Sequence, residues 1–193
     1  AAMTRATVPQ TAALMATAQA KYTGETGVCL ATQGPGAIHL LNGLYDAKLD
    51  HQPVVAIVGQ VARPSYGGQY QQEVDLPTLF KDVAGAYLTV VNSPEQVRHA
   101  VDRAFRIAAA QRTVTCLVVP HDVQDLEAVA EPPPERGRQH SVSGYTPPRV
   151  LPAEADLDRA AEALNAGEKV AILAGAGAQG AGDELTDVAE MLG

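Results

Sequence analysis

The chain has 193 residues, of which 46% are hydrophobic, so it is long enough for one domain and part of a second. Its 22 acidic and 14 basic side chains give a formal net charge of −8, which argues against a nucleic-acid partner because phosphate backbones attract basic surfaces. No apolar stretch is long enough to cross a membrane and no signal peptide is visible, so we expect no membrane association.

The first part of the chain predicts a helix, a strand and a second helix. Residues 10–22 are rich in alanine and are followed by Thr23-Gly24, which favours a helix that ends there. Residues 26–32 are apolar and predict a buried strand. The glycines of Gly34-Pro35-Gly36 then predict a turn into a helix over residues 37–49, where apolar side chains recur at helical spacing.

Strands and helices continue to alternate after residue 50. The expected elements are a strand over 53–59, a Gly-rich loop near 61–74, a short helix over 77–84, a strand over 86–91, a helix from Ser93-Pro94 to about 110, and a strand over 113–119. Uniformly apolar strands are typical of parallel sheets that are covered on both faces. We therefore predict an α/β fold with a doubly wound parallel sheet, in which the turn at residues 34–36 and the loop after residue 60 share one edge.

Composition changes between residues 131 and 152. This segment contains Pro132-Pro133-Pro134 and several charged residues, which predicts an extended linker between domains. The expected domains are residues 1–130, incomplete at the N-terminus, and residues 153–193, the start of a second Rossmann-like α/β domain. In that second part we expect a helix over 153–166, a strand over 169–174, a Gly-rich loop and a final helix.

Residues 32–36, which are Thr-Gln-Gly-Pro-Gly, form the first candidate site. Glycines let a ligand approach the backbone closely, and the helix that follows offers amide donors at its N-terminus. In open α/β sheets ligands bind beyond the carboxyl ends of the strands, where this segment is expected. An ordinary tight turn is the alternative.

The residues around this turn carry a longer pattern. The Gly-Pro-Gly turn is followed by His-Leu-Leu-Asn-Gly, by Asp-Ala-Lys-Leu-Asp-His and by Val-Gly-Gln, all between residues 24 and 60. In this order they resemble thiamine-diphosphate-dependent enzymes of the pyruvate oxidase and acetolactate synthase kind. Residues 70–83 and 155–192 resemble further blocks of the same family. The resemblance covers nearly everything from about residue 12 onward, whereas residues 1–10 are expected to lie outside it.

The resemblance implies a thiamine diphosphate site shared between subunits, with a 2-keto acid such as pyruvate as the substrate and a homo-oligomer as the assembly. The pyrimidine-binding domain of such enzymes grips the aminopyrimidine ring, while a separate domain, absent here, holds the diphosphate and Mg²⁺. By position, the pyrimidine pocket is implied to contain Gln33, Gly34, Pro35, Gly36 and Asn42. Gln72 is implied to face the substrate. Gln33 departs from the Ser or Thr that is common at its position, and Asn42 also fits an exposed polar helix face.

The catalytic carboxylate of the family has no counterpart in this sequence. The family carries Arg-His-Glu-Glu before its equivalent of the first helix, and the first of these glutamates relays a proton with the pyrimidine ring. Thr7-Val8-Pro9-Gln10 occupies these positions here, with Pro9 in place of the glutamate. Because proline cannot relay a proton, we expect the chain alone to be inactive. A truncated or frame-shifted start explains this better than a divergent mechanism.

Gly175, Gly177 and Gly180 form a G-x-G-x-x-G motif between a predicted strand and a helix, as dinucleotide-binding sites do. In the family this region binds the ADP part of FAD in the oxidases and binds nothing in many relatives, and the sequence leaves both open. Gln71 stands where the oxidases place an aromatic residue beside the flavin, which weakens the redox interpretation.

No metal site is predicted, because the histidines and cysteines lack metal-site spacing. Cys29 and Cys116 lie in apolar runs and are expected to be core thiols in a reducing, cytoplasmic compartment. Two alternatives remain open from the sequence. One is a nicotinamide-dependent Rossmann oxidoreductase, which rests on the glycine motif alone. The other is a non-catalytic, truncated module that only associates with other chains, which the missing glutamate supports.

Overall fold

The computed structural model describes residues 8–129, 144–146 and 148–193. The chain divides into two compact units, Ala1–Pro147 and Pro148–Gly193. Most of the predicted linker over 131–152 lies outside the described residues. Its described part, residues 144–146 and 148–152, contains neither helix nor strand.

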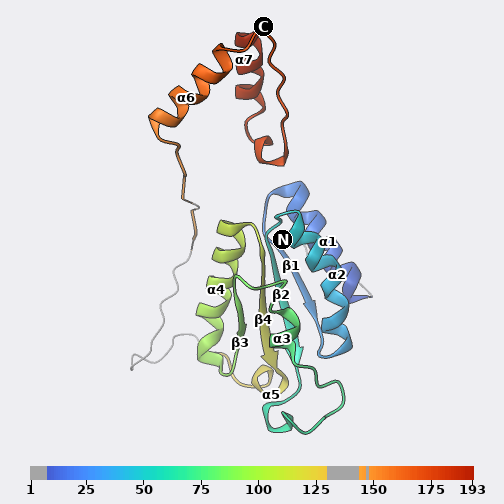
Figure 1. The fold of residues 1–193 in the computed structure, drawn as a ribbon. Coiled ribbons are helices and arrows are strands. Elements are labelled where there is room, and N and C mark those ends of the chain that lie inside the picture. Colours follow the sequence, from blue (N-terminus) through green and yellow to red (C-terminus); the bar gives the residue numbers. More distant parts are fainter. Residues whose placement is uncertain (1–7, 130–143, 147) are drawn as a thin grey trace. The chain divides into compact units, whose positions relative to one another are not determined.

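The first unit contains a four-stranded parallel sheet (Figure 1). Its strands are β1 (Gly27–Ala31), β2 (Val54–Gln60), β3 (Leu88–Val90) and β4 (Val114–Pro120), and their order across the sheet is β1-β2-β4-β3. Every pairing is parallel, which confirms the predicted α/β fold with a parallel sheet. Because all strands run the same way, their carboxyl ends share one edge.

Helices cover both faces of this sheet. α1 (Pro9–Thr23), α2 (Pro35–Leu49) and α3 (Leu76–Phe80) enclose the larger hydrophobic cluster, which includes alternate residues of β2 such as Val54, Ala56 and Val58. α4 (Pro94–Gln111) packs on the other face against Val55 and Leu117. The side chains of β2 are therefore buried on both faces, as its uniformly apolar sequence predicts.

Two glycines let α1 pack unusually close to its neighbours. A Cβ atom added to Gly43 of α2 would lie 2.6 Å from the Cβ of Ala13, and one added to Gly27 of β1 would lie 2.2 Å from the carbonyl oxygen of Ala16. The Thr17 hydroxyl donates a hydrogen bond to the Gly43 carbonyl oxygen over 3.0 Å. Farther along, Lys21 of α1 pairs with Asp50 at the end of α2.

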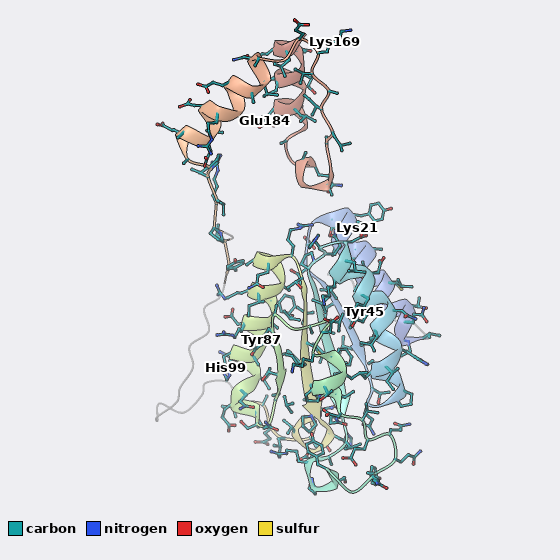
Figure 2. All side chains as sticks on the ribbon, viewed as in Figure 1. Lys21, Tyr45, Tyr87, His99, Lys169 and Glu184 are labelled. Atoms are coloured by element: carbon teal, nitrogen blue, oxygen red, sulfur yellow. The ribbon has the colours of Figure 1, made fainter. Side chains whose placement is uncertain are left out.

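A polar cluster ties α2 to the segment that follows α3. The hydroxyl of Tyr45, which Figure 2 labels, donates to Asp82 Oδ2 over 2.8 Å. Lys48 Nζ donates to the same oxygen over 3.0 Å. These two hydrogen bonds lower the pKa of the Asp82 carboxyl. The cluster therefore joins α2 to the turns that follow α3.

Several element ends differ from the sequence prediction. α2 begins at Pro35 rather than residue 37, because the fixed φ of proline suits the first helical position. α3 ends at Phe80 and turns follow it, so the helix expected over 77–84 is shorter. Ser93 occupies the N-cap of α4, but its side chain makes no capping hydrogen bond. A four-residue helix, α5 (His121–Gln124), was not predicted.

The second unit contains α6 (Glu154–Asn165), a 3₁₀ turn η2 (Ala176–Ala178) and α7 (Gly182–Leu192). The strand expected over 169–174 is absent from this described unit. A strand needs a hydrogen-bonded partner, and the unit supplies none, so Leu173 is left 99% exposed. No helix in the described parts of the chain is long and apolar enough to cross a membrane.

Candidate functional site

The candidate site lies at the carboxyl edge of the first unit's sheet, where four connections meet. The turn of residues 32–34 follows β1, the loop of residues 61–75 follows β2, Asn92 follows β3, and α5 follows β4. Figure 1 shows the loop after β2 and α5 at the same end of the sheet. The predicted shared edge for residues 34–36 and the loop after residue 60 is thus observed.

The turn after β1 contains two glycines at positions where neighbouring atoms leave no room for a side chain. Gly34 has φ 55° and ψ −118°, a backbone conformation that side chains disfavour. A Cβ atom on Gly34 would lie 2.7 Å from the carbonyl oxygen of Gln72 and 2.8 Å from its Cβ. A Cβ atom on Gly36 would lie 2.7 Å from Thr32 Cγ2. The fold therefore brings the backbone of Gln72 directly against the Gly-Pro-Gly turn.

Pro9, which the family resemblance aligns with the catalytic glutamate, begins α1, and the direction of α1 relative to α2 shows where this end lies. Contacts between α1 and α2 advance together along both helices, from Ala13 with Gly43 to Lys21 with Asp50, so the two helices run in the same direction. Pro9 is the first residue of α1, and α2 begins at the turn. The start of α1 therefore lies at the turn end of the helix pair.

The loop of residues 61–75 is fastened at its start by Arg63. Its backbone N–H donates to Asp122 Oδ1 over 2.9 Å and its Nε donates to Asp122 Oδ2 over 2.7 Å. Its guanidinium also donates to the carbonyl oxygen of Asn92. The hydrogen bond from the Arg63 backbone is the main cause that lowers the pKa of Asp122. This one side chain links the connections that follow β2, β3 and β4.

Glu73 fastens the other end of the same loop. Its Oε1 accepts from the backbone N–H of Gly67 over 2.6 Å, and its Oε2 accepts from that of Tyr70 over 3.0 Å. Together with Gln69 these residues line an open hollow of about 270 Å³. The hollow is a surface feature of the loop, beside the segment that carries Gln72.

The remaining predicted site residues have varied surroundings. Gln33 is half-buried, whereas Pro35 and Asn42 are exposed, and Asn42 lies two turns into α2, about 10 Å along the axis from Pro35. The glycine motif of the second unit is also exposed. Added Cβ atoms would meet nothing within 4 Å at any of its three glycines, Gly175, Gly177 and Gly180. The described residues contain no group of three or more His, Cys, Asp or Glu side chains that could hold a metal ion.

Sequence reasoning missed Arg63, Asp122 and Glu73. The first two follow the carboxyl ends of β2 and β4 within three residues, which is the signal that could have identified them. Glu73 lies inside a segment already noted for its family resemblance, but its backbone partners lie in an irregular loop whose shape no periodicity predicts.

Comparison with known proteins shows which family this chain resembles. A model of the thiamine pyrophosphate enzyme N-terminal TPP binding domain matches residues 5–79. The expectation that residues 1–10 lie outside the family is therefore wrong for residues 5–10.

Three relatives illustrate the similarity to full-length proteins. The chain is 38% identical to an uncharacterized 42.6 kDa protein of Pseudomonas amyloderamosa over 95% of this chain and 45% of that protein. It is 37% identical to the pyruvate oxidase of Lactiplantibacillus plantarum over 93% of this chain and 29% of the oxidase. It is 43% identical to the large subunit of acetolactate synthase isozyme 2 of Escherichia coli over 64% of this chain and 22% of that subunit.

The chain spans less than half the length of each of these relatives. The matched domain contains β1, β2 and the turn between β1 and α2, together with the loop that carries Gln72. From the parallel α/β sheet, the glycine turn and these similarities together, we conclude that the chain belongs to the thiamine-pyrophosphate-dependent enzyme family that includes pyruvate oxidases and acetolactate synthases.

Proposed function

We propose that the turn of residues 32–36 and the loop of residues 61–75 hold the aminopyrimidine ring of thiamine diphosphate. The observation that carries this proposal is the contact between Gly34 and the backbone of Gln72, which joins two segments far apart in sequence at the carboxyl edge of the sheet. Gly34 and Gly36 leave no side chain between a ligand and the backbone of the turn. Both glycines are buried in this structure, Gly34 under Gln72 and Gly36 under Thr32, so the flat ring would lie along the edge of the turn, beside Gln72.

The parent enzyme, in this proposal, acts on a 2-keto acid such as pyruvate. The names of the pyruvate oxidase and acetolactate synthase relatives support this substrate class but differ in the reaction, so we propose the class alone. The thiazolium carbon of the cofactor, when bound, supplies the nucleophile for the keto group. The residues described here would bind and orient the pyrimidine end, with Gln72 on the substrate side.

The diphosphate, Mg²⁺ and the proton-relaying carboxylate would come from elsewhere. The described residues contain no group of three or more His, Cys, Asp or Glu side chains that could hold a metal ion. Pro9, the first residue of α1, would stand where the family resemblance expects the glutamate. We therefore propose that this chain alone does not consume pyruvate when supplied with thiamine diphosphate and Mg²⁺. A pyruvate consumption assay with saturating cofactor tests this directly, and measurable turnover would refute it.

Calorimetric titration separates the two halves of the cofactor. If this chain holds only the pyrimidine end, thiamine and thiamine diphosphate should bind with equal affinity, and Mg²⁺ should change neither value. Tight, Mg²⁺-dependent binding of the diphosphate form would show that the chain also anchors the phosphates. Failure of both compounds to bind at millimolar concentration would overturn the assignment of the pyrimidine site.

A single substitution tests the position of Pro9. Pro9→Glu places a carboxylate at the turn end of α1, where a hydrogen bond to the pyrimidine should tighten thiamine binding about tenfold, equivalent to about 1.4 kcal/mol. Gln10→Glu is the matched control, because it adds the same charge to the same helical turn one residue away, on an exposed side chain. Equal affinities for the two variants would contradict the proposed location of the ring.

Three further features of the family are proposals for this protein. FAD binding would use the exposed glycines 175, 177 and 180, which their own unit does not require to be glycine. A homo-oligomer would complete the site from a second subunit. A cytoplasmic location fits two buried cysteines that are not joined to each other.

A further inference from the structure

The loop of residues 61–75 has a backbone that its own sequence does not favour. Gln69 and Gln72 have φ of 54° and 65°, in the left-handed region that side chains disfavour. Gly67 in the same loop has φ of 77°. Residues keep such conformations only where the surrounding contacts impose them, so something must hold this loop in shape.

The carboxylate of Glu73 provides these contacts. Both of its oxygens accept backbone N–H groups, from Gly67 and from Tyr70, and its own backbone N–H donates to the Tyr70 carbonyl oxygen over 2.9 Å. Hydrogen bonds to a charged acceptor are stronger than neutral ones. Glu73 thus closes the tip of the loop onto itself through three hydrogen bonds.

Glu73 is in turn held close to the sheet. The carbonyl oxygen of Val74, the next residue, accepts a hydrogen bond of 2.8 Å from Nε2 of Gln60, and Gln60 is buried at the end of β2. The loop tip is therefore fixed relative to the carboxyl edge of the sheet. Arg63 holds the start of the loop separately, through Asp122, so the two ends do not depend on the same side chain.

Gln72 lies between these fixed points and the turn after β1. It directly precedes Glu73, and its left-handed φ turns its carbonyl oxygen and Cβ against Gly34. We propose that Glu73 is a positioning residue that sets where Gln72 stands relative to the glycine turn and so to the cofactor ring. The cofactor part of this inference rests on the proposed function, whereas the contact between Gln72 and Gly34 does not.

Substitutions at Glu73 test the inference in the complete chain. Glu73→Gln keeps the size of the side chain but turns one acceptor into a donor that faces an N–H group. Glu73→Ala removes both acceptors, and Glu73→Asp keeps the charge on a shorter stem. Glu25→Gln is the control, because Glu25 is exposed and precedes β1, at the opposite edge of the sheet.

The first measurement needs no ligand. In Glu73→Gln and Glu73→Ala we expect amide hydrogen exchange at Gly67 and Tyr70 to accelerate at least tenfold, and the nuclear Overhauser contacts between Gln72 and Gly34 to disappear. Glu73→Asp should retain part of both signals. The urea midpoint should change little, because residues 62–73 of the loop belong to neither hydrophobic cluster. Persistence of the Gln72–Gly34 contacts in both disruptive variants would overturn the inference.

The second measurement uses thiamine as the probe. We expect the affinity to fall about tenfold in Glu73→Gln and Glu73→Ala, to recover partly in Glu73→Asp, and to be unchanged in Glu25→Gln. Loss of the Gln72–Gly34 contacts with unchanged affinity would overturn the cofactor part of the inference and leave the proposed pyrimidine site intact. If the unsubstituted chain does not bind thiamine, the proposed function fails, and the contacts alone decide whether Glu73 positions Gln72.

Discussion

Replacement of Gly34 by alanine tests whether the turn after β1 and the loop after β2 are as closely fitted as the structure shows. Gly34 combines an unusual backbone conformation, φ 55° and ψ −118°, with a neighbour that leaves no room for a side chain. Gly24 provides a matched control. It also has a positive φ, 73°, but an added Cβ atom there would meet nothing within 4 Å.

The two variants should differ in their free energy of unfolding, because an added methyl group collides with Gln72 at position 34 and with nothing at position 24. A side chain in a disfavoured backbone region costs about 1–3 kcal/mol at Gly34 and about 1–2 kcal/mol at Gly24. At Gly34 the new methyl group would also lie 2.7 Å from the Gln72 carbonyl oxygen, and overpacking of this kind costs about 1–3 kcal/mol. We expect Gly34→Ala to lose about 2 kcal/mol more free energy of unfolding than Gly24→Ala.

Urea denaturation, monitored by circular dichroism, measures this difference. The two variants can be compared if their unfolding free energies depend on urea concentration with equal slopes. Thiamine titration of the same samples should show weaker binding in Gly34→Ala and unchanged binding in Gly24→Ala. If Gly34→Ala is no less stable than Gly24→Ala, then Gln72 moves away from the added methyl group without any loss of stability. The argument that the contact shapes the site would then be refuted.

Three further predictions concern the pH dependence of stability, the thiols and the assembly. The pKa of Asp82 is lowered in the folded chain because Lys48 and Tyr45 donate hydrogen bonds to its carboxylate. The stability that Asp82 contributes is therefore present above its unfolded pKa and is lost as the pH falls through its folded pKa. Asp82→Asn should therefore be less stable than the unsubstituted chain at pH 7, with the gap in urea midpoint closing below about pH 4; a gap that stays constant down to pH 2 would contradict this. Burial raises the pKa of Cys29 to about 12 and raises that of Cys116 as well, so a disulfide reagent at pH 8 should modify neither thiol until urea unfolds the chain, and rapid labelling of the native protein would be inconsistent with the described core. Because β1 is an edge strand of the described sheet, with exposed apolar side chains, we expect a dimer or larger assembly by sedimentation velocity at micromolar concentration, against which a clean monomer would count heavily.

The regular elements of the first unit were predictable because their signals are local. Continuous apolar runs mark β1, β2 and β4, and Gly24 ends α1 in the left-handed conformation that the sequence suggested. Their parallel pairing also followed, since strands that alternate with helices are connected in one direction. The expected strand over 169–174 failed for the opposite reason, because an apolar run forms a strand only where another strand pairs with it.

The site was only partly predictable. The glycine turn could be located from its spacing and its family resemblance, but its contact with Gln72 depends on a loop in which two glutamines adopt left-handed backbone conformations. No sequence rule assigns such a conformation to glutamine, because the hydrogen bonds that impose it come from a carboxylate elsewhere in the loop. Arg63 and Asp122 are 59 residues apart and meet only because their strands end at one edge.

The close approach of α1 also constrains how this sequence can vary. Alanine normally improves a helix relative to glycine, yet at position 43 the gain of about 1 kcal/mol would be offset by collision with Ala13. Positions 13 and 43 therefore share one small volume, whereas a side chain at position 27 would collide with the backbone of Ala16 whatever side chain residue 16 carries. A larger residue on either side can be accepted only if the helix shifts as a whole, which would also displace its first residue, Pro9, from the turn. Among related sequences we expect positions 13 and 43 to stay small together, so the residue at one predicts the size of the residue at the other, whereas position 27 should stay glycine independently of residue 16.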